Sequence, residues 1–275
     1  MNILDQIVLH KQKEITRNKA QISVAELQKA LFFERKCTSL KNLLQLGDSS
    51  GIIAEFKTKS PSKGMIKAIP ERQLRADFVS QITKGYQKAG ATAISVLTDQ
   101  AYFAGEYQDL QEARNAVQVP LLRKDFMLDE YQIIEAKAWG ADLILLIAAC
   151  LEPDTLKYLA QFAHSLGLEV LMEVHDEAEL QAYLNEHIDL VGVNNRNLKT
   201  FEVSIETSLK LAELIPHQFV KISESGISQV DTILKLQAAG YQGFLMGENF
   251  MKAENPAQAC TTFMQELQTA QLSKI

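Results

Sequence analysis

Short runs of apolar, often β-branched residues alternate with longer amphipathic stretches from residue 51 onward. This alternation is typical of repeated strand–helix units around a parallel sheet, because strands covered on both faces are apolar throughout, whereas surface helices carry only an apolar stripe. Eight runs predict strands: GIIAEFK (51–57), AISVLT (93–98), VPLLRKDF (119–126), DLILLIAA (142–149), EVLMEV (169–174), LVGVNN (190–195), FVKISE (219–224) and GFLMG (243–247).

The segments between these runs predict helices. Tyr131, Ile134 and Ala138, for example, recur at helical spacing after the third run. Glycines that commonly end helices precede several predicted strands, at Gly90, Gly140, Gly167 and Gly240. Eight such pairs favour the α/β class and a closed (β/α)8 TIM barrel. An open dinucleotide-binding sheet carries GxGxxG in its first turn, whereas the first turn here reads KTKSPSKGM.

Residues 1–50 lie outside this count. Ile3, Ile7 and Ile15 form an apolar stripe, and a second helical stretch is predicted around Val24 to Leu31. We expect an N-terminal helical extension packed on the barrel. The sequence leaves open whether this extension caps the barrel bottom or forms a wall of the substrate site.

Composition limits the class of protein. The 275 residues are 47% hydrophobic and 23% charged, and we expect one domain over residues 1–275, since α/β barrels of roughly 250 residues are routinely single domains. The net charge of −6 argues against a nucleic-acid or anionic-membrane surface. A phosphorylated small molecule stays possible, because one phosphate needs only a few backbone amides and one or two basic side chains. No obligate protein partner is indicated.

Cysteine usage and the N-terminus bear on the compartment. Cys37, Cys150 and Cys260 are odd in number and lack CxxC spacing, so they suggest neither a disulfide framework nor a thiolate metal site. The N-terminus is amphipathic and charged, and no run of about 20 apolar residues occurs. We expect a cytoplasmic protein that is neither exported nor membrane-spanning.

Charged residues interrupt strands that should be apolar. Glu55 and Lys57 share one face of the first predicted strand, while Ala54 and Phe56 lie on the other. A buried charge costs several kcal/mol unless it is paired. Either the two form a structural ion pair, or they line a wet pocket at the C-terminal mouth, where barrel enzymes keep their chemistry.

Further polar residues follow other strands at the same mouth. They are Lys124 at the end of the third run, on the face shared with Phe126, Glu173 in the fifth, Asn194 and Arg196 at the end of the sixth, and Glu224 and Ser225 at the end of the seventh. This agreement favours a catalytic site, where mutual charge and burial can bring the pKa of a Lys or Glu toward neutrality. Strand alternation cannot turn both Glu224 and Ser225 inward, so the chain must turn there.

The loops after the last two strands predict a phosphate site. Gly226 and Gly247 follow strands seven and eight, whose loops commonly bind phosphate in barrels through backbone N–H groups. Glycines there can instead merely make turns. As a pair in these loops they predict a phosphate cradle, with Lys59 or Ser60 as a further contact.

These motifs resemble those of the indole-3-glycerol phosphate synthase family. The resembling blocks, in order, are IIAEFKTKSPSKG, LLRKDFMLDEYQIIEAKAWGAD, EVLMEVH, VGVNNRNL, SESGI and GFLMGENF, and they span residues 51 to 250. The resemblance implies a lyase of tryptophan biosynthesis that needs no metal or organic cofactor. Its substrate would be 1-(2-carboxyphenylamino)-1-deoxyribulose 5-phosphate, whose ring closure releases carbon dioxide and water.

The resemblance also implies residue roles. Lys124 would be the general acid that protonates the ketone oxygen, and Glu173 the base in later steps. Lys57 would hold the substrate carboxylate or donate a proton during dehydration. The supporting roles would fall to Glu55, which orients the lysines, to Asn194, which hydrogen-bonds the reacting part of the substrate, and to Arg196 and Glu224, which support this shell.

Substrate binding completes the implied site. Phe126 would pack on the aromatic ring. The phosphate would bind Ser225, Gly226 and Gly247 together with Ser60 and Lys59. At Glu248 the chain departs from the small hydroxyl residue of many family members, and a carboxylate repels phosphate. Only the backbone amide of Glu248 is therefore expected to contact the phosphate.

Three other functions are alternatives for such a chain. A phosphoribosylanthranilate isomerase would need a Cys/Asp pair at the strand ends, where this chain has Lys and Glu. A Schiff-base aldolase would use Lys124 or Lys57 as the nucleophile, with a lowered pKa. An inactive scaffold would not need the acid, base and phosphate loops that the sequence contains.

Overall fold

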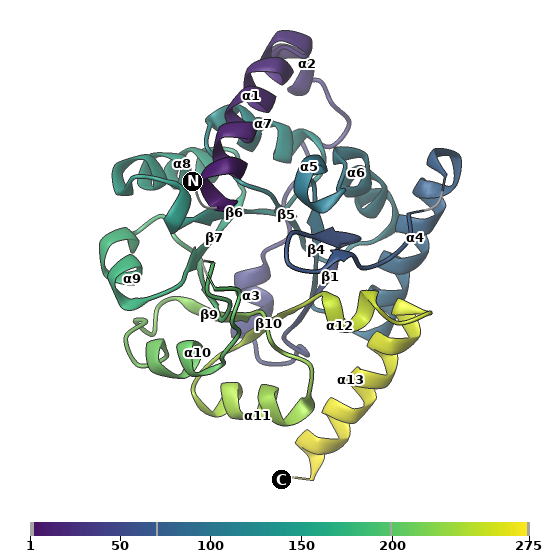
Figure 1. The fold of residues 1–275 in the computed structure, drawn as a ribbon, viewed down its shortest axis with the longest axis vertical. Coiled ribbons are helices and arrows are strands. Elements are labelled where there is room, and N and C mark those ends of the chain that lie inside the picture. Colours follow the sequence, from purple (N-terminus) through teal and green to yellow (C-terminus); the bar gives the residue numbers. More distant parts are fainter. Residues whose placement is uncertain (1–2, 70, 199, 274–275) are drawn as a thin grey trace.

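Eight parallel strands close into a barrel in the computed structural model, which describes residues 3–69, 71–198 and 200–273 (Figure 1). The strands are β1 (Ile52–Phe56), β4 (Ala93–Leu97), β5 (Leu121–Lys124), β6 (Leu143–Ile147), β7 (Glu169–Val174), β8 (Leu190–Asn194), β9 (Val220–Glu224) and β10 (Gly243–Met246). Each pairs with the next along the chain, and β1 closes the ring by pairing with both β4 and β10. All eight predicted strands and the (β/α)8 barrel are confirmed.

An outer layer of helices surrounds the barrel (Figure 1). It consists of α4 (Arg72–Ala89), α6 (Tyr107–Ala116), α7 (Glu130–Ala138), α8 (Pro153–Ser165), α9 (Glu177–Tyr183), α10 (Glu206–Leu211), α11 (Val230–Ala238) and α13 (Pro256–Leu272). Shorter elements at the carboxyl ends of strands are the hairpin β2 (Lys59–Ser60) and β3 (Gly64–Met65), α5 (Gln100–Phe103), the 3-10 turn η1 (Ala148–Cys150) and α12 (Glu248–Met251). The predicted glycine caps are confirmed by left-handed backbone at Gly90, Gly140, Gly167 and Gly240.

Side-chain alternation divides the interior into two cores. Ile52, Ala54 and Phe56 of β1 point outward and join the apolar layer between strands and helices. Ile53 points inward and joins a smaller core that fills the barrel. Glu55 follows on the same inward face, one layer closer to the carboxyl end, where the apolar filling stops.

The N-terminal extension covers both ends of the barrel. It forms α1 (Ile3–Gln21), α2 (Val24–Leu27) and α3 (Leu40–Gln45). Leu40 and Leu44 of α3 enter the core inside the barrel from below, where Glu169 accepts hydrogen bonds from the backbone of Leu40 and Lys41. The first turn of α1 instead reaches the cavity at the carboxyl end. The second predicted helix was too long, because residues 28–31 form turns after the capping box at Ser23.

A buried ion cluster anchors α1 over the mouth. The ammonium of Lys11, with no exposed side-chain surface, lies 2.9 Å from carboxylate oxygens of Glu14, Asp99 and Asp125. Asp125 directly follows Lys124, so α1 is fastened to the end of β5. Burial opposes the charge of Lys11, but the three carboxylates outweigh it and raise its pKa.

Among the residues that the structure describes, no helix combines the length and the apolar character that a membrane span requires.

Candidate active site

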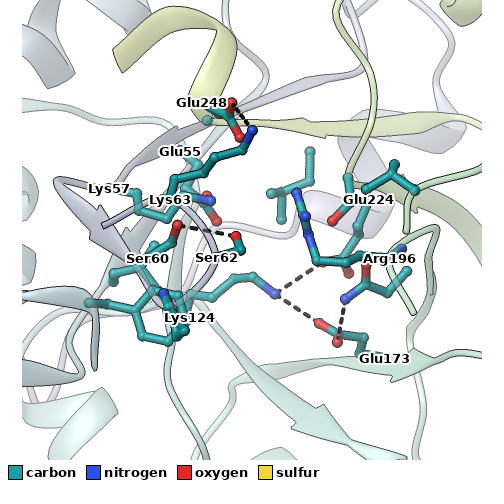
Figure 2. Close-up of a pocket in the computed structure, with 18 of the residues that line it drawn as sticks. Glu55, Lys57, Ser60, Ser62, Lys63, Lys124, Glu173, Arg196, Glu224 and Glu248 are labelled. Atoms are coloured by element: carbon teal, nitrogen blue, oxygen red, sulfur yellow. Dashed lines mark hydrogen bonds and ion pairs between the residues drawn. The ribbon is translucent and has the colours of Figure 1, made fainter. Parts of the chain in front are cut away.

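A cavity of about 530 Å³ opens at the carboxyl ends of the strands. Its wall includes residues from the strand ends and their loops, together with Ile3, Leu4 and Ile7 of α1. All but one of the predicted site residues line it: Glu55, Lys57, Ser60, Lys124, Phe126, Glu173, Asn194, Arg196, Glu224, Ser225, Gly226 and Gly247. Figure 2 shows that the labelled side chains converge on one space from different strands.

Lys59 is the exception. Its ammonium donates a hydrogen bond to the carbonyl of Ala101 at 3.3 Å, and Lys59 is not part of the cavity wall. Lys59 and Ser60 are neighbours in the short strand β2, so their side chains leave opposite faces of the hairpin. Ser60 faces the cavity, whereas Lys59 does not line it, so the structure does not support the expected contact of Lys59 with the phosphate. Lys63, in the same loop, lines the cavity instead.

Lys124 is shared by two buried carboxylates. Its ammonium donates to Glu173 Oε2 at 2.9 Å and to Glu224 Oε2 at 3.0 Å (Figure 2). Asn194 Nδ2 donates to the other oxygen of Glu173 at 2.9 Å. Lys124, Glu173 and Glu224 lie on inward positions of β5, β7 and β9, above the apolar residues that fill the barrel. The barrel thus places one cation between two potential bases.

Burial and charge give these groups different proton affinities. Burial opposes the charge of Lys124, but Glu173 and Glu224 outweigh it and raise its pKa. Burial also favours the neutral form of Glu173, but Lys124 and His175 prevail and lower the pKa of this carboxyl. Burial raises the pKa of Glu224 to about 7, since Lys124 offsets it only in part and Glu173 adds repulsion. The expected titration near neutrality therefore belongs to Glu224, whereas the pKa of Lys124 moves away from neutrality.

Lys57 and Glu55 form a second ion pair in the cavity. Glu55 is buried, while Lys57 keeps 20% of its side-chain surface exposed. Gly247 leaves the space that Glu55 occupies, because a Cβ there would lie 2.5 Å from Glu55 Oε1. The sequence left open whether Glu55 and Lys57 form a structural ion pair or line a pocket. Both hold: the carboxylate of Glu55 is buried in the barrel, and the ammonium of Lys57 faces the cavity.

The turn expected after β9 is present. Ser225 has a φ of 67° and Gly226 a φ of 75°, so two consecutive residues adopt left-handed backbone. Left-handed backbone costs free energy at a serine, so contacts with the surrounding residues must hold Ser225 in it. It allows Glu224, Ser225 and Gly226 all to face the cavity. At Gly226 a Cβ would lie 2.4 Å from Val203 Cγ1, so the close packing there requires glycine.

The side chain of Glu248 turns toward Lys63. Their charged atoms are 3.7 Å apart, and both side chains are exposed at the cavity rim (Figure 2). The Lys63–Glu248 pair therefore lies beside the turn after β10. Sequence reasoning missed Lys63 as a site residue, although it is the lysine of the quoted SPSKG block.

Gly192 makes room for Glu224, which gives a test of the Lys124 network. A Cβ at residue 192 would lie 2.3 Å from Glu224 Oε1. We expect Gly192→Ala to displace this carboxylate and lower kcat by about a hundredfold, the order of loss caused by misplacing a reacting group by about 1 Å. The matched control is Gly243→Ala, whose Cβ would meet Ile222 Cδ1 in the core at 2.2 Å. The control should lower Tm without changing kcat, and equal kcat values for the two variants would contradict the expectation.

The barrel and its mouth define a class of protein: a (β/α)8-barrel enzyme with paired lysines and carboxylates. A family model described as indole-3-glycerol phosphate synthase matches residues 4–263. The chain is 45% identical over 269 residues to the indole-3-glycerol phosphate synthase of Bacteroides thetaiotaomicron, covering 97% of this chain and 99% of that protein. The enzyme of the same name from Exiguobacterium sibiricum is 46% identical over 261 residues, covering 94% and 95%. The chain belongs to the indole-3-glycerol phosphate synthase family, a family of carboxy-lyases in tryptophan biosynthesis.

Solved structures support the fold alone. Thiamine phosphate pyrophosphorylase from Pyrococcus furiosus aligns with a TM-score of 0.58 at 17% identity, covering 83% of this chain and 99% of that one. The structure of KGPDC from Streptococcus mutans aligns with a TM-score of 0.56 at 16% identity, covering 70% and 92%. At such identities, shared architecture carries no information on the reaction.

Proposed function

We propose that the cavity converts 1-(2-carboxyphenylamino)-1-deoxyribulose 5-phosphate into indole-3-glycerol phosphate, carbon dioxide and water. The observation that carries this assignment is Lys124, held at 2.9 Å and 3.0 Å from Glu173 and Glu224 at the cavity floor. The reaction needs an acid at the ketone oxygen and a base for a later proton loss. A cation between two carboxylates of unequal proton affinity supplies both.

In the first step, the ring carbon that bears the carboxyl group attacks the ketone carbon. Negative charge then develops on the ketone oxygen, and the Lys124 ammonium stabilises it and transfers its proton. The raised pKa of Lys124 keeps it protonated before the reaction, and an alkoxide is basic enough to take the proton. Loss of carbon dioxide then restores the aromatic ring. Phe126, whose side chain lines the cavity, packs on that ring.

Dehydration forms the double bond of the new ring. The hydroxyl group leaves as water after receiving a proton, and the neighbouring carbon loses one. Glu173, with its lowered pKa, is ionised and accepts that proton, while Asn194 holds its second oxygen. Lys57 faces the cavity beside Glu55, where it holds the substrate carboxylate or donates the proton that releases water.

The phosphate is assigned to the rim. Ser60, Ser225, Gly226 and Gly247 line the same cavity, and backbone N–H groups of such turns bind phosphate. Arg196, which also lines the cavity, supports the bound substrate from the loop after β8. The protein acts in the cytoplasm on this phosphorylated small molecule.

The experiment that tests the assignment uses chelator-treated protein and the carboxyphenylamino-deoxyribulose phosphate. Saturable appearance of indole fluorescence without added metal is the expected result. Absence of fluorescence from folded protein that still binds the compound would overturn the assignment.

A Schiff-base aldolase finds no support at Lys124. A lysine that attacks a carbonyl must be a neutral amine, whereas the pKa of Lys124 is raised. Borohydride in the presence of a keto-sugar phosphate should therefore leave the mass of the protein unchanged. A stable adduct on Lys124 or Lys57 would restore the aldolase hypothesis.

Glu248 should affect substrate binding more than chemistry. We expect Glu248→Ser to lower KM by about threefold to tenfold, because it removes a carboxylate near the phosphate and frees Lys63, an effect of about 1 kcal/mol. The matched control is Glu186→Ser, which breaks a surface pair with Lys157 away from the cavity and should leave KM unchanged. A large fall in kcat for Glu248→Ser would instead place its carboxylate in the reaction.

A further inference from the structure

Two carboxylates share Lys124, yet their surroundings differ. Glu173 Oε1 receives Asn194 Nδ2 at 2.9 Å and lies 3.4 Å from His175 Nε2. Glu224 Oε1 is buried and has no hydrogen-bond partner among the described residues. Because hydrogen-bond donors and nearby cations stabilise an ionised carboxylate more than a neutral carboxyl group, this asymmetry favours charge on Glu173 and a proton on Glu224.

His175 is the part of this asymmetry that the reaction scheme does not use. It follows β7 directly and is 12% exposed, but it is not among the residues that line the cavity. Its Nδ1 lies 3.1 Å from Glu179 Oε2, the oxygen that also accepts the backbone N–H of His175 at 2.7 Å. Its Nε2 faces Glu173 at ion-pair distance without an aligned hydrogen bond.

The position of Glu179 is fixed independently of the cavity. Glu179 lies in the first turn of α9, and its backbone N–H donates to the N-cap side chain of Asp176 at 2.9 Å. The ring of His175 is therefore held from the outer side by a helix and points its other nitrogen at the site. Such a carboxylate–histidine pair fixes both the tautomer and the orientation of the ring.

The imidazole is positively charged at neutral pH. Burial favours its neutral form, but Glu173 and Glu179 outweigh burial and raise the pKa of His175 to about 10. Burial raises the pKa of the nearby Cys150, which stays a neutral thiol. The titratable groups that face the His175–Glu173 pair are Lys124 from β5, Cys150 from η1, Glu179 from α9 and Glu224 from β9.

We propose that His175 is a positioning residue: clamped as a cation between Glu179 and Glu173, it keeps Glu173 ionised and so leaves the site's proton on Glu224. It acts through Glu173 and does not touch the substrate. The inference rests on the proposed role of Glu173 as the base. Without the imidazolium, the proton affinities of Glu173 and Glu224 become more alike. Part of the protein then carries the proton on Glu173, which cannot act as a base.

The test compares pH profiles of kcat. In His175→Leu, loss of a cation within 4 Å of Glu173 should move the acidic limb of the profile up by about 1–3 pH units. We expect kcat at pH 6 to fall by about twofold to tenfold, because part of the protein then carries the proton on Glu173, and to recover to nearly the unmodified value at pH 8.5, with KM nearly unchanged. His175→Lys, which retains a positive charge, should restore part of the lost activity at pH 6.

The control is His164→Leu. His164 pairs with Asp189 at 2.7 Å, so this variant removes a matched histidine–carboxylate contact outside the cavity. The profile of this control should match that of the unmodified protein. A His175→Leu profile that is lowered equally at every pH, or not lowered at all, would overturn the inference. Absence of indole formation by the unmodified protein would overturn the proposed function instead.

A second measurement needs no variant. The chain has five histidines, and nitrogen NMR of the unmodified protein reports the charge of each imidazole. One imidazole should stay protonated from pH 6 to beyond pH 8, where an ordinary histidine with a pKa near 6.5 is neutral. If all five are neutral at pH 8, His175 is not a cation between Glu179 and Glu173, and the inference is wrong.

Discussion

Replacing Lys124 with alanine is expected to lower kcat by about two to four powers of ten, the usual loss when a positioned general acid is removed. Lys124 supplies the only ammonium that contacts both Glu173 and Glu224 among the described residues. Lys57, the other lysine at an inward strand end of the cavity, does not take its place because it pairs with Glu55. The loss should therefore appear in kcat, measured by indole fluorescence at saturating substrate.

The fold should survive this substitution. The cavity is open to solvent, so water can replace the ammonium, and Glu224, whose pKa is already about 7, can take up a proton. Circular dichroism and Tm should accordingly stay close to those of the unmodified protein. The matched control is Lys41→Ala at the opposite end of the barrel, where Lys41 pairs with Asp189 at 3.6 Å. A Lys124→Ala variant with unchanged kcat would remove Lys124 from the mechanism.

Local sequence patterns predict most of the barrel and its mouth, because they depend on chain geometry alone. Alternation along β1 places Glu55 inward and Phe56 outward, and the structure agrees. The same rule implies a turn between Glu224 and Ser225, which the left-handed φ of Ser225 provides. Since all strands of a closed barrel end at one mouth, polar strand ends locate the site before any contact is known.

Contacts between distant segments are not predictable in this way. Lys11 lies on an amphipathic helix and looks like a solvated lysine, yet Asp99 and Asp125 bury it completely. The direction of Lys59 depends on the register of a two-residue strand, which no periodicity fixes. His175 differs, because the quoted EVLMEVH block contains it. The sequence does not indicate the role proposed for it, because Glu179 approaches His175 only through the fold of α9.

Replacing Glu173 with glutamine should lower kcat by about two to three powers of ten, because the amide cannot accept the proton that the carbon loses during dehydration. Glutamine has nearly the same shape as glutamate, and Lys124 can still donate a hydrogen bond to its amide oxygen. KM and Tm should therefore change little. The matched control is Glu169→Gln at the other end of β7, where Glu169 accepts from Leu40 and Lys41. That variant should lower Tm and leave kcat unchanged.

The pH profile separates a lost base from a general disturbance. Repulsion from Glu173 contributes to the raised pKa of Glu224, about 7, so Glu224 is protonated below that pH and ionised above it. In Glu173→Gln this repulsion is gone and Lys124 pairs with Glu224 alone, so the pKa of Glu224 falls. Any inflection of kcat/KM near pH 7 should consequently move toward acid in the residual activity. An inflection that stays at pH 7 would mean that Glu224 and Glu173 titrate independently, which their shared Lys124 contradicts.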